Sequence, residues 1–391
     1  MPRSRRSPIP TAFFIVAAAN FLFFLNFAFF FLLPLWVLDG GGGEELAGRV
    51  VGIAGFSGLI ALPAVGYLLD RFGRRRFMIA GSLAAALLSW AFLAIDEVGP
   101  ALYLLRIAQG VAFTCAFTGA QTLAVLFAPF SRRAEAIGWF GISTVITHAI
   151  SPALGEVIIE HWGYDAMFAA GGTLGILSFL LSCTLPRPPL LVTHERSREH
   201  DPRLVRHAVV AASLAMVCYG FGFGATQTFV PVLMERFDIG RVGVFFVFWS
   251  LSAVTVRLFA GAASDTIGRR AVLVPAMATM STAVAVLAFA RTMPWMVAVA
   301  VIFGFAQGLL YPTMNALVAD WSKPGNIGRT QSMFSGSYSF GIATSAFFFG
   351  TIVEDYGFTA MFLTTLAITC LGLGIFVAGP KEVGLNGEDL P

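Results

Sequence analysis

The sequence contains few charged residues. Asp, Glu, Lys and Arg together make up 12% of its 391 residues, against about 25% in an ordinary soluble domain. Hydrophobic residues make up 57%. A soluble core cannot bury that much apolar sequence behind so little charge. The shortage of charge therefore excludes a water-soluble protein and indicates one that is embedded in a membrane.

Cysteine is equally scarce. The four cysteines, Cys115, Cys183, Cys218 and Cys370, all fall within apolar segments and show neither metal-binding nor redox spacing. No polar stretch is long enough to fold as a separate enzyme domain. From these shortages we expect no enzymatic activity, no cofactor, no metal ion and no nucleic-acid partner.

The chain does contain a series of apolar runs of about 20 residues, each long enough as a helix to cross about 30 Å of hydrocarbon. We predict twelve membrane spans, at residues 11–37, 48–69, 77–95, 101–128, 136–159, 166–185, 207–233, 242–263, 271–290, 295–318, 330–352 and 357–379. With the N-terminus inside, 19 of the 25 Lys and Arg residues lie in cytoplasmic segments and 4 lie on the opposite side. Because positive charge accumulates on the cytoplasmic side, this bias places both termini in the cytoplasm.

A charged loop occurs twice, between the second and third predicted spans and again between the eighth and ninth. The second copy begins 195 residues after the first. In each copy the first glycine permits close contact between helices, and the aspartate lies at a helix end, where it can meet Arg side chains or the N-terminus of a neighbouring helix. The motif positions are Gly66, Asp70, Arg71, Gly73, Arg74 and Arg75 in the first copy, and Gly261, Asp265, Gly268, Arg269 and Arg270 in the second.

Two further segments repeat at nearly the same distance. Gly163–Phe168 (Gly-Tyr-Asp-Ala-Met-Phe) is matched by Gly357–Phe362 (Gly-Phe-Thr-Ala-Met-Phe). The dipeptide Gln109-Gly110 has a looser counterpart in Gln307-Gly308. Repeats in corresponding positions indicate a duplicated membrane protein, which is how many solute transporters are built.

We therefore predict two parallel six-helix halves, residues 1–185 and 207–391. The segment between them, 186–206, is rich in proline and polar residues and lacks helical periodicity. That composition is typical of a linker, and the topology places it in the cytoplasm.

Twelve spans in two parallel halves, with this loop in each half, resemble the major facilitator superfamily over essentially the whole chain. The first loop fits the family's Gly-x-x-x-Asp-Arg-x-Gly-Arg-Arg signature at every position, and the second departs from it only at Thr266. The resemblance implies an all-α membrane protein with two pseudo-symmetric six-helix bundles. It also implies that spans 1, 4, 7 and 10 line a central pathway and that the two loops gate its inner end. As an alternative, the Arg clusters serve only as topology anchors.

Two arginines lie away from the ends of predicted spans, where an unpaired charge costs several kcal/mol. Arg106 begins Arg106-Ile-Ala-Gln109-Gly110, which resembles the family's Arg-x-x-Gln-Gly motif. In the family this arginine faces the cavity and is associated with proton coupling. Arg257, about 12 Å from the inner face, resembles arginines of members that handle organic anions. Snorkelling to the outer interface remains the alternative for Arg106, and pairing within the C-terminal half remains the alternative for Arg257.

Polar residues in these spans are candidates for the wall of the pathway, because a polar side chain that faced lipid would lack a partner. In the tenth span three of them recur every four residues and form one stripe on the helix. Hydrogen bonding between helices remains the alternative for each candidate. The candidates are Asn20, Asn26, Arg106, Gln109, Gln121, Tyr219, Gln227, Arg257, Gln307, Tyr311 and Asn315.

Acidic residues are absent from the middle of every predicted span. If protons drive transport, the candidates are Arg106, His148 and Glu156, because an imidazole titrates near neutral pH and Glu156 lies near the outer end of its span. A histidine that is only hydrogen-bonded is the alternative. The same span keeps Pro152 and Gly155 of the Gly-x-x-x-Gly-Pro-x-x-Gly pattern that antiporters of the family carry, but has other small residues in place of the first two glycines.

We therefore expect a secondary active transporter that moves a small organic or amphipathic solute by alternating access. Resemblance to bacterial efflux permeases implies proton-coupled export by a monomer in the bacterial inner membrane, with a small-molecule substrate, protons and the lipid bilayer as its partners. Uptake or exchange of an organic anion through Arg106 and Arg257 stays open as an alternative, and so does a non-transporting membrane sensor.

Overall fold

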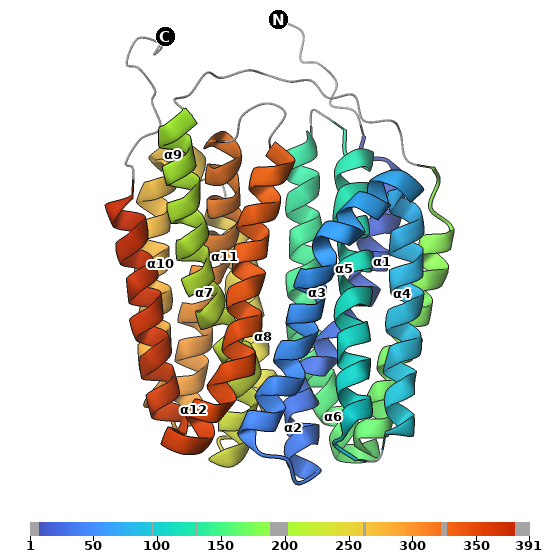
Figure 1. Ribbon diagram of the computed structural model, residues 1–391, viewed down its shortest axis with the longest axis vertical. Coiled ribbons are helices and arrows are strands. Elements are labelled where there is room, and N and C mark those ends of the chain that lie inside the picture. Colours follow the sequence, from blue (N-terminus) through green and yellow to red (C-terminus); the bar gives the residue numbers. More distant parts are fainter. Residues whose placement is uncertain are drawn as a thin grey trace, which may run out of the picture. The chain divides into compact units, whose positions relative to one another are not determined.

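The computed structural model of the protein describes residues 8–95, 97–129, 132–187, 202–260, 263–321 and 327–379. In these residues the chain is built from helices joined by short turns (Figure 1). Ten of the described helices are long and apolar enough to cross a membrane. The predicted all-α membrane fold is therefore confirmed.

Contacts between residues divide the chain into two compact units. Unit 1 comprises Met1–Val192 together with Arg241–Ser250, and unit 2 comprises Thr193–Gly240 together with Leu251–Pro391. The predicted linker, 186–206, lies largely outside the described residues, and the predicted division at its two ends stays a prediction. The segment Arg241–Ser250 is part of the predicted C-terminal half, but it belongs with unit 1.

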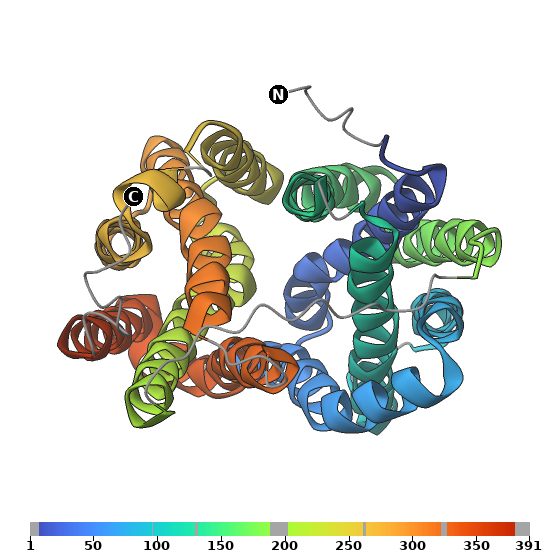
Figure 2. The same ribbon diagram turned by 90° about the horizontal axis from the view of Figure 1, so that it is seen from above.

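Unit 1 is a bundle of helices that pack side by side (Figures 1 and 2). α5 packs against α3 and α4, and α6 packs against α1 and α4. Its elements are α1 (Thr11–Phe29), η1 (Phe30–Leu32), α2 (Leu33–Asp39), α3 (Glu44–Phe72), α4 (Arg74–Ala91), η2 (Phe92–Ala94), α5 (Pro100–Phe127) and α6 (Arg133–Cys183).

Unit 2 is a second bundle, in which α12 packs along α7 and against α10, and α10 packs against α11. It also contains the second half of α8, whose first half lies in unit 1. Its elements are α7 (Pro202–Arg236), α8 (Val242–Ala260), α9 (Ala263–Ile267), α10 (Arg269–Leu287), α11 (Met293–Trp321) and α12 (Ile327–Ala378).

Two membrane helices are long enough to cross the bilayer twice. The candidate spans Glu135–Cys183 in α6 and Thr330–Ala378 in α12 each have 49 residues. Gly163 (φ 80°, ψ 177°) interrupts the first, and Gly357 (φ 81°, ψ 169°) interrupts the second. Both glycines occupy a backbone region that is essentially closed to other residues. Each long helix is therefore a pair of spans, which agrees with the twelve predicted.

The repeated loop has the same backbone in both units. Gly73 (φ 96°, ψ 135°) separates α3 from α4, and Gly268 (φ 103°, ψ 140°) separates α9 from α10. Each copy needs glycine here because L side chains rarely adopt such positive φ angles. The repeat in sequence is therefore also a repeat in structure.

The looser Gln-Gly repeat marks close helix crossings. A Cβ atom added at Gly110 would lie 2.0 Å from the carbonyl oxygen of Ala54, and one added at Gly308 would lie 2.8 Å from that of Ala253. α5 therefore touches the backbone of α3, as α11 touches that of α8. At Gly66, by contrast, an added Cβ would meet no heavy atom of the described chain within 4 Å. The close helix contact expected at Gly66 is thus not found within unit 1.

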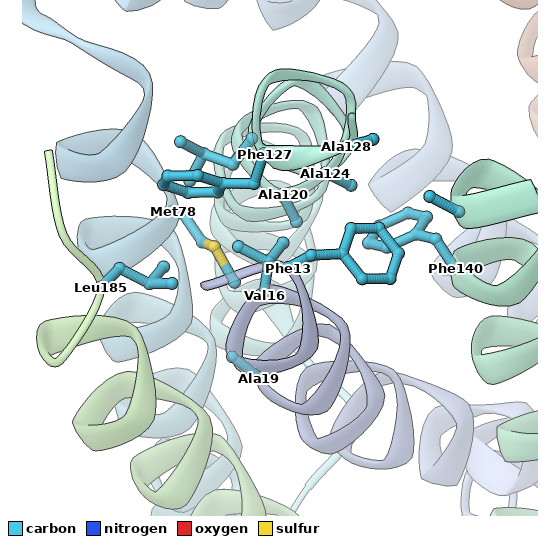
Figure 3. Packing of buried hydrophobic residues seen from close by; sticks show 12 residues of the cluster. Phe13, Val16, Ala19, Met78, Ala120, Ala124, Phe127, Ala128, Phe140 and Leu185 are labelled. Carbon is cyan, nitrogen blue, oxygen red and sulfur yellow. The ribbon is translucent and has the colours of Figure 1, made fainter. Parts of the chain in front are cut away.

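A core at one end of unit 1 joins four helices (Figure 3). Phe13, Val16 and Ala19 of α1 pack with Met78 of α4, with the last turns of α5 and with the first turns of α6. Leu185, which follows α6, packs into the same cluster. Because lipid tails are as apolar as these side chains, close packing rather than escape from water holds such helices together.

Replacing Gly163 by alanine should destabilise the protein by about 1–3 kcal/mol, because the new Cβ would strain the backbone. No atom crowds this glycine, so strain is the only cost. Gly138→Ala is the matched control, since Gly138 is equally uncrowded but lies inside α6, where alanine is favourable. Thermal unfolding of the purified protein, followed by tryptophan fluorescence, measures both variants. Equal melting temperatures would contradict the role assigned to Gly163.

Candidate functional site

In unit 1 the repeated loop is tied to its own bundle. Arg74 Nη2 lies 2.9 Å from Oδ1 of Asp70, which is 71% exposed, and Arg71 is exposed. Arg75 Nη2 donates a hydrogen bond to the carbonyl oxygen of Cys183, 2.6 Å away in the last turn of α6. A cation at this end of a helix is favourable, because the last carbonyl groups lack helical partners and carry the negative end of the dipole.

The loop in unit 2 makes the corresponding hydrogen bonds to the end of α12. Arg270 Nη2 donates to the carbonyl oxygens of Phe376 (2.9 Å) and Val377 (2.6 Å) at the end of α12. Its neighbour Arg269 forms an ion pair with Asp320 of α11, with 2.6 Å between Nε and Oδ2. The loop arginines thus hold the last helix of each unit.

Two predicted members of the second loop cannot be placed. Gly261 lies outside the described residues, and so does the side chain of Asp265. The described contacts of the loop arginines connect each loop to helices of its own unit. Their role as a gate stays a prediction.

Arg106 of α5 is buried, with 5% of its surface exposed. Its Nε donates to the carbonyl oxygen of Val50 in α3 at 3.1 Å, and its Nη1 donates to Oε1 of Gln109 at 2.7 Å. The guanidinium also lies 5.7 Å from the centroid of the Phe30 ring. These described partners are all neutral, so they accept two hydrogen bonds and leave its charge uncompensated.

Both asparagines of α1 are buried. Asn26 Nδ2 donates to Oγ of Ser89 (2.7 Å) and to the carbonyl oxygen of Gly171 (2.6 Å), which ties α1 to α4 and α6. Asn20 Nδ2 donates to Oγ1 of Thr144 at 3.1 Å. Its carbonyl oxygen has no hydrogen-bond partner among the described residues. Asn26 therefore serves the packing of unit 1, whereas Asn20 keeps an unused acceptor.

His148 of α6 lies among aromatic rings and is 9% exposed. Its ring centroid lies 5.0 Å from that of Phe31, 5.3 Å from that of Trp249 and 6.1 Å from that of Phe24. Its Nδ1 lies 2.9 Å from the carbonyl oxygen of Thr144, one turn earlier. The imidazole therefore lies where α6 meets α1, η1 and the first half of α8.

Glu156 lies about two turns further along α6 and binds the start of α8. Its Oε1 accepts a hydrogen bond from the backbone N–H of Val242 at 2.8 Å, and its Oε2 accepts one from that of Gly243 at 3.0 Å. These N–H groups have no partner inside α8, and the positive end of the helix dipole adds to the attraction. Arg241 and Glu160 form an ion pair beside this cap, with 2.9 Å between Nη2 and Oε2.

The contact between α6 and the first half of α8 continues away from the cap. A Cβ added at Gly243 would lie 2.5 Å from Cα of Ala153, and Ser250 Oγ donates to the carbonyl oxygen of Val145 at 2.7 Å. This seam explains why Arg241–Ser250 belongs with unit 1. The role of Glu156 in proton coupling stays a prediction.

In unit 2 the predicted polar stripe of α11 faces α12. Gln307 Nε2 donates to Oη of Tyr338 at 2.7 Å, and the rings of Tyr311 and Tyr338 lie 5.2 Å apart. Asn315 accepts a hydrogen bond from Gln331 of α12. The three residues of the stripe therefore lie on one face, as their spacing predicts.

Arg257 of α8 lies beside the same group of residues. Its Nε donates to the carbonyl oxygen of Gly308, the residue after Gln307, at 3.3 Å. The structure thus brings Arg257, Gln307 and Tyr311 together within unit 2.

Three other predicted cavity residues differ in burial. Gln121 is exposed and Gln227 is half-buried, whereas Tyr219 is fully buried. Their assignment to the pathway stays a prediction.

The sequence interpretation missed Tyr338, which contacts two of the predicted residues. It lies in the eleventh predicted span, which the family resemblance does not place on the pathway. A signal was available, because Ser335–Ser339 (Ser-Gly-Ser-Tyr-Ser) is a polar run inside an otherwise apolar span.

Comparison with models of protein families identifies the family of this chain. The model of the Major Facilitator Superfamily matches residues 12–256 and 212–388, which together cover nearly the whole chain. The chain belongs to the major facilitator superfamily. It is therefore a multi-pass membrane transporter of that superfamily and not an enzyme.

Relatives within the superfamily include transporters of several bacteria. The MFS-type transporter YhhS of Escherichia coli K12 is 23% identical over 357 residues, which cover 87% of this chain and 86% of YhhS. The multidrug resistance protein MdtG of Dickeya zeae is 26% identical over 374 residues, covering 89% and 90%. The multi-drug resistance efflux pump PmrA of Streptococcus pneumoniae is 22% identical over 358 residues, covering 87% and 89%.

Solved structures of the superfamily share the fold. The nucleoside transporter NupG superposes with a TM-score of 0.76 at 14% identity, covering 95% of this chain and 100% of NupG. The human organic anion transporter MFSD10 superposes with a TM-score of 0.71 at 16% identity, with the same coverage. Identities this low show a common fold and carry no information on substrate.

Glu156→Gln should loosen the start of α8, because an amide presents one acceptor where the carboxylate presents two. Backbone hydrogen exchange at Val242 and Gly243 should become about fivefold faster, corresponding to a loss of about 1 kcal/mol. Hydrogen–deuterium exchange of the peptide that contains these residues is the measurement. Glu160→Gln is the matched control, because it removes an ion pair whose two side chains are 58% and 53% exposed and which should contribute little. Equal exchange in both variants would contradict the capping role.

Proposed function

We propose that the protein exports a small amphipathic organic compound in exchange for protons, as a monomer in the bacterial inner membrane with both termini in the cytoplasm. The substrate would bind near the middle of the bilayer. Two six-helix halves, 1–185 and 207–391, joined by the linker 186–206, would rock around it and expose it to each side in turn. The repeated loops would then gate the inner end of the pathway.

The observation that carries this proposal is the aromatic group of unit 1. The ring centroids of Phe27 and Phe113 lie 4.4 Å apart, and those of Phe24 and Phe117 lie 5.0 Å apart. Phe27, Phe113 and Phe117 are only partly buried. Partly exposed rings on α1 and α5 form a surface suited to the apolar part of an amphipathic solute.

His148 is the proposed proton carrier. Its ring lies next to Phe24 and also contacts Trp249 of α8. A protonated imidazole is a cation and is attracted to the faces of aromatic rings. A neutral imidazole lacks this cation–π attraction. Protonation would therefore change how α1, α6 and α8 pack against one another, and this change would link proton binding to movement of the helices.

Relatives support the direction of transport. MdtG of Dickeya zeae and PmrA of Streptococcus pneumoniae carry the names multidrug resistance protein and multi-drug resistance efflux pump. Export of amphipathic compounds by this chain would be the corresponding activity.

A second candidate function is transport of an organic anion. It is favoured by the buried charge of Arg106, whose described partners are neutral. Together with Arg257 it would provide positive charge for a carboxylate. The proton-exchange proposal and this candidate differ in the charge of the solute that moves.

Flux into proteoliposomes tests the proposal. Vesicles with an acidic lumen should accumulate ethidium, and a protonophore should collapse the accumulation. His148→Gln should abolish gradient-driven uptake and leave the exchange of labelled for unlabelled ethidium intact, because only the proton step is lost. His161→Gln is the matched control, because its Nδ1 makes the same contact with a backbone carbonyl, at 2.9 Å from Val157, on an exposed part of α6.

Gradient-driven uptake by His148→Gln equal to that of the unaltered protein would remove His148 from the coupling step. Movement of carboxylates but not of ethidium in the same vesicles would favour the second candidate. In that case Arg257→Gln should abolish the flux.

A further inference from the structure

We propose that Gln307 and Tyr338 form a subsite in unit 2 for the hydroxyl group of a hydroxylated aromatic solute. The pair would select such solutes among the compounds that the transporter carries. This inference rests on the proposed function as a carrier of small amphipathic compounds, and it names the substrate class.

The first argument is the unused hydrogen-bonding capacity of this pair. Each residue is 8% exposed. Gln307 Nε2 donates to Tyr338 Oη at 2.7 Å, and Gln307 Oε1 has no hydrogen-bond partner among the described residues. Tyr338 Oη accepts the bond from Gln307, and none of the contacts in the described part of the chain gives its own proton an acceptor. Leaving buried polar groups unpaired costs free energy, which a bound partner would recover.

The second argument is the kind of group that fits. The pair offers one acceptor, Gln307 Oε1, and one donor, the hydroxyl of Tyr338. A hydroxyl group on a ligand can donate to the first and accept from the second at the same time, whereas an ether, a ketone or an ammonium group can make only one of these bonds. The arrangement is therefore complementary to a hydroxyl.

The third argument is the surroundings of the pair, which are aromatic. The ring of Tyr311 lies 5.2 Å from that of Tyr338, with 48° between the planes, and the ring of Phe223 lies 5.9 Å away on α7. Phe223 and Tyr311 are only partly buried. Partly exposed rings can make edge or offset contacts with another ring. The hydroxyl should therefore be carried by an aromatic ring.

The charge of Arg257 bears on which compounds are suitable probes of this subsite. Its Nε donates to the carbonyl oxygen of Gly308, the residue that follows Gln307. The positive charge of this guanidinium would attract an anionic probe that binds the subsite. Hydroxynaphthoate and naphthoate are therefore suitable probes, because they share the ring and the carboxylate and differ only in the hydroxyl.

Binding of the two probes to the purified full-length protein, measured by fluorescence anisotropy, tests the proposal without any proton gradient. Hydroxynaphthoate should bind about fivefold to tenfold more tightly than naphthoate. Tyr338→Phe and Gln307→Leu should each bring the ratio close to one by weakening hydroxynaphthoate alone. Tyr356→Phe is the matched control, because Tyr356 lies in the same unit and is 76% exposed, and it should keep the full ratio.

Naphthoate binding shows that each variant is folded, because this probe does not use the hydroxyl subsite. Equal binding of the two probes to the unaltered protein would overturn the proposal and indicate that a water molecule fills the position. A ratio that survives both Tyr338→Phe and Gln307→Leu, or no binding of hydroxynaphthoate at all, would overturn it as well. Loss of gradient-driven ethidium flux with an intact ratio would contradict the proposed proton exchange and leave the subsite standing.

Discussion

The structure depends on one constraint, which is that lipid offers no hydrogen bonds to polar groups inside a span. Asn26 meets this constraint by bonding to Ser89 and to the backbone of Gly171, and Arg106 meets it through the carbonyl oxygen of Val50. In both cases a polar side chain holds helices together. Gln307 Oε1 is a buried polar atom with no hydrogen-bond partner among the described residues, and it is the atom that we propose for a solute hydroxyl.

Duplication preserved the backbone of the repeated loop in both units. The loop glycines Gly73 and Gly268 keep the same unusual dihedral angles. Among the described contacts, Arg74 pairs with Asp70 of its own loop, and Arg269 pairs with Asp320 of α11. The residues proposed for the solute and the proton lie outside the repeated loop, so the loop identifies the architecture and carries no information on the cargo.

Features set by local sequence could be predicted. Apolar runs of bilayer length predicted the membrane spans. The repeated segment that begins at Gly163 and again at Gly357 lies where each long helix is interrupted. Partners distant in sequence could not be predicted, because packing brings them together. Examples are the cap that Glu156 forms on Val242, 86 residues away, and the bond between Gln307 and Tyr338. The cap also places the first half of α8 in unit 1, against the expected division into halves.

The central claim is that solute and protons move in opposite directions through one carrier. The most direct test is the lumenal pH of proteoliposomes loaded with a fluorescent pH indicator, with no gradient imposed at the start. Ethidium added outside should make the lumen alkaline as it enters, because each solute that enters is exchanged for protons that leave. Entry of ethidium with no change in lumenal pH would contradict the account.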